Sequence, residues 1–223
     1  MKTIGLIGGT SWHATLEYYR GINTKVSKKL GNGNNPELLI HSINIEIMRK
    51  QVMKDIEQKY LEVSQQLASS GAKAIVICAN TPHMVVEKIQ PQIDIPFLHI
   101  ADATARAAQK QGFNSLGLLG TKATMLKPFL KDRLSKKYDL EIAIPEEAYI
   151  DQTHQYISKE LTQGKFSSEA KDFFCLKIQN FKDRGIDAAI LGCTEIPILL
   201  KDVNTALPTL STTDLHIDMA VDF

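Results

Sequence analysis

Short apolar runs alternate along the chain with longer segments in which apolar residues recur every three or four positions. Apolar runs bounded by turn residues are typical of buried parallel strands, and the longer periodic segments are typical of the helices that cover them. We expect strands at 3–7, 37–43, 74–78, 96–100, 115–121 and 140–144, in a run that ends at Gly192, and at 207–210. We expect helices at 12–30, between 44 and 71, from 82, at 101–111, up to 137, at 147–162 and 167–184, and from 212. This alternation predicts an α/β fold.

The second half of the chain resembles the first. The segment 115–121 (SLGLLGT) resembles the opening 3–10 (TIGLIGGT), and 185–190 (GIDAAI) resembles 71–76 (GAKAIV) at nearly the same separation. A solenoid would repeat at a far shorter period. We therefore expect two similar α/β domains, each a parallel sheet flanked by helices, related by a pseudo-twofold axis with a ligand cleft between them.

Two stretches carry candidate chemistry, 75–83 (IVICANTPH) and 190–197 (ILGCTEIP). Each is an apolar run that ends near a cysteine, becomes polar and reaches a proline. A thiol at such a strand-to-helix turn lies where open α/β sheets bind their ligands. The helix start that follows would offer N–H groups to a carboxylate and would lower the pKa of the thiol.

The two turns therefore predict the walls of one site for a small acid. Asn80, Thr81 and Thr194 are candidates to bind its carboxylates. Cys193 is the candidate to move a proton or attack carbon. The sequence is equally consistent with Cys78 as a buried apolar residue and as a reactive thiol. Cys175 lies inside a helical pattern and is expected to be a small buried residue.

The composition narrows the class of protein. Of the 223 residues, 43% are hydrophobic and 23% are charged. The net charge of +1 does not indicate a basic surface of the kind that binds nucleic acid. No uncharged apolar segment is long enough for a membrane span, and the N-terminal apolar run is too short for a signal peptide. Three separated cysteines predict no disulfide framework and fit a reducing cytoplasm.

Neither a metal nor a dinucleotide cofactor is expected. The histidines show no metal-ligand spacing, there is no C-x-x-C motif, and the glycines of 5–9 do not fit G-x-G-x-x-G. His83 and His99, which flank the Cys78 region, are expected in the core or at a helix start. Gln51 and Lys165 could reach an anionic substrate, although a solvated surface position is the more common role for such side chains.

Several stretches together resemble the aspartate/glutamate racemase family, which racemises amino acids without a cofactor. They are 4–12 (IGLIGGTSW), Asn80-Thr81, 99–104 (HIADAT), 118–121 (LLGT) and 192–197 (GCTEIP). The resemblance implies a homodimer that acts on aspartate or glutamate without pyridoxal phosphate. It also implies a first domain of residues 1–98 plus 208–223 and a second domain of residues 99–207, with the active site between them.

In that family one residue removes the α-proton and a second returns a proton to the other face. Cys193 matches the second acid/base residue, and Thr194 is its substrate-binding neighbour. Asn80, Thr81 and Thr121 match substrate-contacting positions, and Thr10 in the opening motif is expected to join them.

This chain departs from the family at the first acid/base position. Ala79 stands there and cannot carry a proton. Cys78 precedes it, but strand alternation would turn its side chain to the opposite face unless the strand end breaks that alternation. Ser211 also replaces an aspartate that relatives often carry.

Ala79 leaves two alternatives to a racemase open. One is a single-cysteine decarboxylase or isomerase of a small diacid. The other is a catalytically silent carboxylate-binding homologue.

Overall fold

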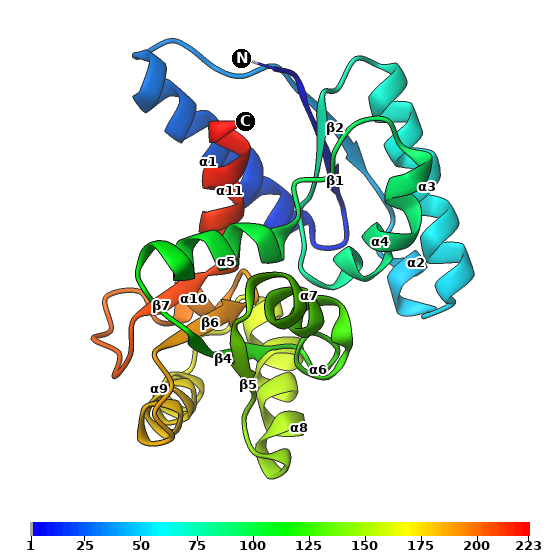
Figure 1. Cartoon of the computed structure of the whole chain (residues 1–223). Helices are drawn as coiled ribbons and strands as arrows, with labels where there is room; N and C mark the ends of the chain where they lie inside the picture. Colours follow the sequence, from blue (N-terminus) through cyan, green and yellow to red (C-terminus); the bar gives the residue numbers. More distant parts are fainter. Residues whose placement is uncertain (1) are drawn as a thin grey trace. The chain divides into compact units, whose positions relative to one another are not determined.

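Each half of the internal repeat forms its own parallel sheet in the computed structural model, which describes residues 2–223 (Figure 1). The chain divides into two units. The first contains residues up to Ile100 together with His216–Phe223, and the second contains Ala101–Leu215. The expectation of two parallel sheets flanked by helices is confirmed.

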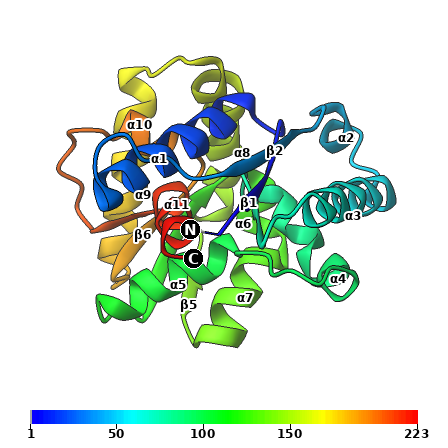
Figure 2. The same ribbon diagram turned by 90° about the horizontal axis from the view of Figure 1, so that it is seen from above.

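The first sheet has three parallel strands in the order β2-β1-β3: β1 (Ile4–Gly8), β2 (Leu38–Ser42) and β3 (Ala74–Ile77). Helix α1 (Trp12–Leu30) lies on one side of β1 and β2 and helix α3 (Met53–Ser69) on the other (Figures 1 and 2). The shorter elements are α2 (Glu46–Arg49), a 3-10 turn (Thr81–Val85), α4 (Val86–Ile89) and a second 3-10 turn (Gln90–Gln92).

Alternate residues of β3 enter two different cores. Ile75 and Ile77 pack with the buried residues of α3, whereas Val76 packs with α1 and the end of the final helix α11 (Thr212–Asp222). Salt bridges from Lys25 and Lys29 of α1 to α11 link the two helices. This two-sided burial explains why β3 reads as a continuous apolar run.

The second sheet has four parallel strands in the order β5-β4-β6-β7: β4 (Ser115–Gly120), β5 (Glu141–Ala143), β6 (Ala188–Gly192) and β7 (Thr209–Ser211). The remaining helices are α5 (Ile100–Lys110), α6 (Lys122–Leu126), α7 (Pro128–Tyr138), α8 (Glu147–Gln155), α9 (Ser168–Asp183) and α10 (Ile196–Leu199), with a π turn (Tyr156–Glu160) and a 3-10 turn (Leu161–Gln163) after α8.

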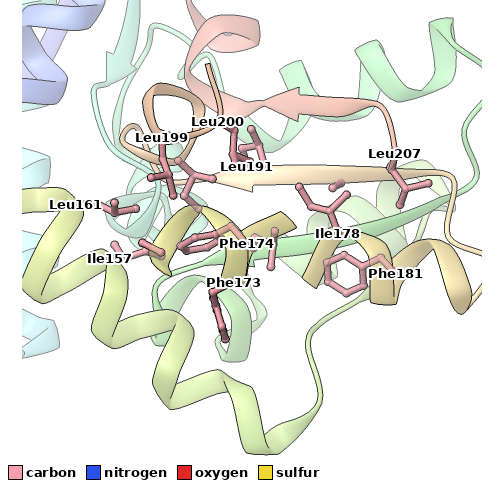
Figure 3. Packing of buried hydrophobic residues seen from close by; sticks show 14 of the residues in the cluster. Ile157, Leu161, Phe173, Phe174, Ile178, Phe181, Leu191, Leu199, Leu200 and Leu207 are labelled. Carbon is pink, nitrogen blue, oxygen red and sulfur yellow. The ribbon is translucent and has the colours of Figure 1, made fainter. Parts of the chain in front are cut away.

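Helix α9 covers one face of the second sheet. Phe174, Ile178 and Phe181 of α9 are at most 1% exposed and pack with Leu191 of β6 (Figure 3). In that view the α9 end with Phe174 lies toward Leu191, and the end with Phe181 lies toward the start of β6. The loop that enters α9 is therefore on the side of the sheet where β6 ends.

The fourth expected strand, 96–100, is wrong. Phe97 forms a single parallel bridge with Ile75, and α5 already begins at Ile100. The groups that would continue the ladder are engaged elsewhere: the Leu98 carbonyl accepts from His216, and the N–H of Ile100 donates to Nε2 of His83. The expected helix up to 137 is divided at Lys127, which takes an extended conformation (ψ 148°) because it precedes Pro128.

The last segment of the chain is shared between the units. Residues 208–223 were expected in the first domain, but β7 pairs with β6 of the second sheet. Only His216–Phe223 belong to the first unit. Within residues 2–223, no helix combines the length and apolar composition that a bilayer span requires.

Candidate functional site

The turn after β6 brings a thiol, a hydroxyl and a carboxylate together. Cys193 follows the last residue of β6 and is half-buried, and α10 begins three residues later. The Cys193 thiol donates to Oε2 of Glu195 at 2.9 Å, and the Thr194 hydroxyl donates to the same oxygen at 2.7 Å. Glu195 is only 7% exposed. One buried carboxylate oxygen thus accepts hydrogen bonds from both candidate site residues.

The electrostatics of this turn keep the thiol protonated. Burial raises the pKa of Cys193 well above its usual range, and the negative charge of Glu195 raises it further. Backbone N–H groups of Thr194 and Glu195 oppose the shift without reversing it. The expectation that the helix start lowers the thiol's pKa is therefore wrong, because α10 has four residues and a carboxylate occupies its start.

Thr121 belongs to the same edge of the second sheet. It caps α6 by accepting the N–H of Thr124 at 3.3 Å, and its hydroxyl lies 3.0 Å from the Thr124 hydroxyl. Gly120 and Gly192, paired in the sheet register, directly precede Thr121 and Cys193. A Cβ on Gly192 would come within 2.9 Å of a β4 carbonyl oxygen, so the close approach of the two strand ends requires glycine.

The first unit presents the other predicted turn, at the end of β3. The Cys78 N–H donates to Ile7 O at 2.9 Å, so the ladder continues through this residue. Cys78 packs in the same core as Val76, is 1% exposed, and has a thiol pKa that burial raises strongly. Strand alternation therefore persists to the end and turns the Cys78 thiol into the core.

The remaining predicted residues of this unit follow β3 and β1, which are neighbours in the sheet. Asn80 is 7% exposed, and Thr81 begins the 3-10 turn and is half-buried. Thr10 is half-buried, and its hydroxyl lies 2.7 Å from the phenol of Tyr60. These three side chains gather at one edge of the first sheet.

Two predicted residues lie in exposed loops. Gln51 stands between α2 and α3 in a left-handed conformation (φ 53°). Lys165 is exposed in the loop that enters α9. Cys175, expected to be buried, is partly exposed on α9.

Sequence reasoning did not assign a role to Glu195. The sequence feature that could have revealed such a role is the position of Glu195 two residues after Cys193, because a turn there can fold the carboxylate back onto the thiol. Across the part of the chain that the structure describes, no group of three His, Cys, Asp or Glu side chains is arranged to hold a metal ion.

The chain is similar to known proteins in sequence and in fold. The family model described as Asp/Glu/Hydantoin racemase matches residues 7–220. A candidate Asp/Glu racemase from Yersinia pestis is 35% identical, with a TM-score of 0.94 over 100% of this chain and 98% of that one. An aspartate racemase homologue from Pyrococcus horikoshii OT3 is 30% identical, with a TM-score of 0.88 over the same shares.

Curated sequences add a more distant group. A glutamate racemase from Limosilactobacillus reuteri is 25% identical over 156 residues, which are 69% of this chain and 56% of that protein. The chain thus spans little more than half the length of this relative. Because the family model covers nearly the whole chain, both units included, the protein belongs to the Asp/Glu/Hydantoin racemase family.

Proposed function

We propose that this protein interconverts the enantiomers of aspartate or glutamate by removing and returning the α-proton, without a cofactor. The observation that carries the proposal is the Cys193 thiol, hydrogen-bonded at 2.9 Å to the buried carboxylate of Glu195 at the end of β6. Relatives named as glutamate racemases and an aspartate racemase homologue support the choice of substrate.

In this proposal Cys193 and Glu195 act as a pair that holds one proton. In the basic direction the thiol proton moves to Oε2 of Glu195, and the resulting thiolate takes the α-proton of the substrate. When the thiol returns this proton to the same face of the carbanion, the carboxyl proton moves back to sulfur and the configuration is retained. For inversion, a water molecule protonates the opposite face, because Ala79 has no proton to give, and the Cys193–Glu195 pair releases one proton to solvent. The Thr194 hydroxyl and the backbone N–H groups of Thr194 and Glu195 stabilise the negative charge during the transfer.

The substrate carboxylates need donors, because the carbanion delocalises its charge into the α-carboxylate. We propose that side chains at the carboxyl ends of the strands supply them: Thr10, Asn80, Thr81, Thr121 and Thr194. Gln51 and Lys165 are proposed to approach the substrate from their loops, where an exposed ammonium or amide can meet an acidic side chain.

A second function is favoured by one specific observation in the first unit. Ala79 carries no proton, and the neighbouring Cys78 thiol is buried with a raised pKa. A reaction that needs only one working thiol avoids this difficulty. The candidate is decarboxylation or isomerisation of a small diacid, in which Cys193 delivers a proton to one face.

The test is α-proton exchange in D₂O, followed by NMR on each enantiomer of aspartate and glutamate. Exchange with inversion of configuration supports the racemase. Exchange with retention on every substrate, or carbon dioxide release from a substituted malonate without amino-acid exchange, overturns it in favour of the one-thiol reaction. Binding of aspartate or glutamate by calorimetry, with no exchange, overturns it in favour of a silent carboxylate-binding protein.

We expect Cys78→Ala to leave the exchange rate of the wild-type protein unchanged. The physical reason is that its thiol is 1% exposed and its pKa is raised, so it is a poor acid or base for a substrate. The same NMR assay measures the rate, and thermal unfolding measures the cost of the small cavity. A folded Cys78→Ala variant that lost exchange would show that Cys78 does carry a proton.

A further inference from the structure

Three buried histidines of the first unit lie directly behind the turn that carries Asn80. His83 comes from the 3-10 turn after β3, His99 from the residue before α5, and His216 from α11. They are 1%, 2% and 0% exposed. The His83 ring lies 4.7 Å from that of His99 and 5.4 Å from that of His216, measured between centroids. The function proposed above uses none of them.

The hydrogen bonds of His83 determine its protonation state. Its Nε2 accepts the backbone N–H of Ile100 at 3.3 Å, so this nitrogen carries no proton. Its Nδ1 faces the carbonyl oxygens of Ala79 at 2.8 Å and Asn80 at 3.2 Å, so this nitrogen must donate. His83 is therefore neutral, with its proton on Nδ1.

The hydrogen bonds of His216 fix the position of one of its protons. Its Nε2 lies 2.6 Å from the carbonyl oxygen of Leu98, so Nε2 carries the proton. Its Nδ1 lies 2.8 Å from the phenol oxygen of Tyr18, within hydrogen-bond distance. Both nitrogens of each ring are thus engaged within the fold.

We propose that His83, supported by His216, is a positioning residue that holds the Ala79–Asn80 backbone and so aims Asn80 and Thr81 at the substrate. The inference rests on the proposed function, because it assumes that these two side chains bind the substrate. His83 is suited to this because it ties the end of β3 to the start of α5, and His216 ties α11 to the segment just before α5. Positions at a functional site need such support from a surrounding shell of hydrogen bonds.

The cluster also makes the turn sensitive to acid. Burial lowers the pKa of His83, and the neighbouring His99 and His216 lower it further. Those two are the titratable groups that face its ring in the described chain, and the Tyr18 phenol faces His216. Protonating His83 would remove the acceptor for the N–H of Ile100. Because the pKa of His83 is lower in the folded than in the unfolded protein, its contribution to stability is present in full above the unfolded pKa of about 6.5. That contribution is lost as the pH falls below this value.

The test compares His83→Asn with His83→Leu in the full-length protein. The Asn amide nitrogen occupies the place of Nδ1, so it keeps the donor for Ala79 and loses only the acceptor for Ile100. Leucine removes both. We expect His83→Leu to lower kcat/KM by about 10²-fold, mainly through KM, because a displaced binding turn costs that much. We expect His83→Asn to recover most of the loss and His41→Asn, a half-buried histidine of β2, to change nothing.

Two NMR measurements separate this inference from the proposed function. Long-range ¹H–¹⁵N correlations should find the proton on Nδ1 of His83 and on Nε2 of His216 at pH 7.5. The amide signals of Asn80 and Thr81 should shift in His83→Leu and return toward wild type in His83→Asn. Unshifted amides, the opposite tautomers, or a wild-type KM in His83→Leu with an active wild-type protein would each overturn the inference. Absence of exchange in the wild type would overturn the proposed function alone, and the NMR measurements would still decide the role of His83.

Discussion

Replacing Cys193 by serine is expected to lower the rate of α-proton exchange by about 10²–10⁴-fold, the range typical for removal of a positioned acid or base. Serine keeps the size of the side chain and can still donate a hydrogen bond to Glu195. Its hydroxyl is far less acidic than a thiol, however, so the proton held between residue 193 and the carboxylate no longer reaches the substrate. Substrate binding should persist, because the hydroxyl of Thr194 and the edge of the sheet are unchanged. NMR in D₂O measures the rate, and calorimetry measures the binding.

The matched control is Cys175→Ser in the same unit. Cys175 lies on α9, is partly exposed, and its thiol pKa is raised by burial and then by the nearby Asp172. We expect its exchange rate to equal that of the wild type. Equal rates for Cys193→Ser and Cys175→Ser would mean that the Cys193–Glu195 pair carries no proton and that the proposed mechanism is wrong.

The strands and most helices could be predicted because their signals are local. An apolar run such as that of β3 and a periodic segment such as 12–30 encode burial directly in the order of residues. The segment 96–100 carried the same local signal and still formed only one bridge. What decided its structure was the pairing of Leu98 and Ile100 with distant histidine side chains and the early start of α5, which no pattern within the segment reveals.

The position of Cys193 could be predicted, but its chemistry could not. The apolar run fixed the end of β6, and the residue after Gly192 had to lie at that edge. The direction of its pKa shift depends on Glu195 folding back to 2.9 Å from sulfur, which is a matter of side-chain conformation. For Cys78 the alternation rule alone indicated the buried face, and the structure shows that the rule holds to the end of the strand.

The histidine cluster was beyond sequence reasoning for a different reason. His83 and His216 stand far apart in the chain and belong to no shared motif. They meet because α11 returns to the first unit and packs beside α1. Only the tertiary fold brings such residues together, so their roles follow from their hydrogen bonds rather than from their spacing.

Adding one methyl group to the second sheet is expected to lower the stability of the protein strongly. A Cβ at Gly117 of β4 would lie 2.3 Å from the Phe181 ring, which is 1% exposed and packed under the sheet (Figure 3). The ring cannot move into solvent, so β4 and α9 must separate. We expect Gly117→Ala to cost about 3 kcal/mol, the upper end of the range for overpacking. For a chain of this length that lowers Tm by roughly 6–12 °C in a thermal unfolding experiment.

The internal repeat supplies the control for this prediction. Gly5 is the corresponding residue of β1, and a Cβ there would meet atoms of Leu67 and Ala72 no closer than 3.1 Å. Small shifts of those side chains can accommodate a methyl group, so Gly5→Ala should cost about 1 kcal/mol, the lower end of the same range. The double variant Gly117→Ala/Phe181→Leu should lose less stability than the sum of the losses in the two single variants, because removing the ring removes the clash. Two results would contradict this prediction: a stability loss in the double variant equal to the sum of the two single losses, or equal Tm values for Gly5→Ala and Gly117→Ala. Either would show that a methyl group at Gly117 does not clash with the Phe181 ring.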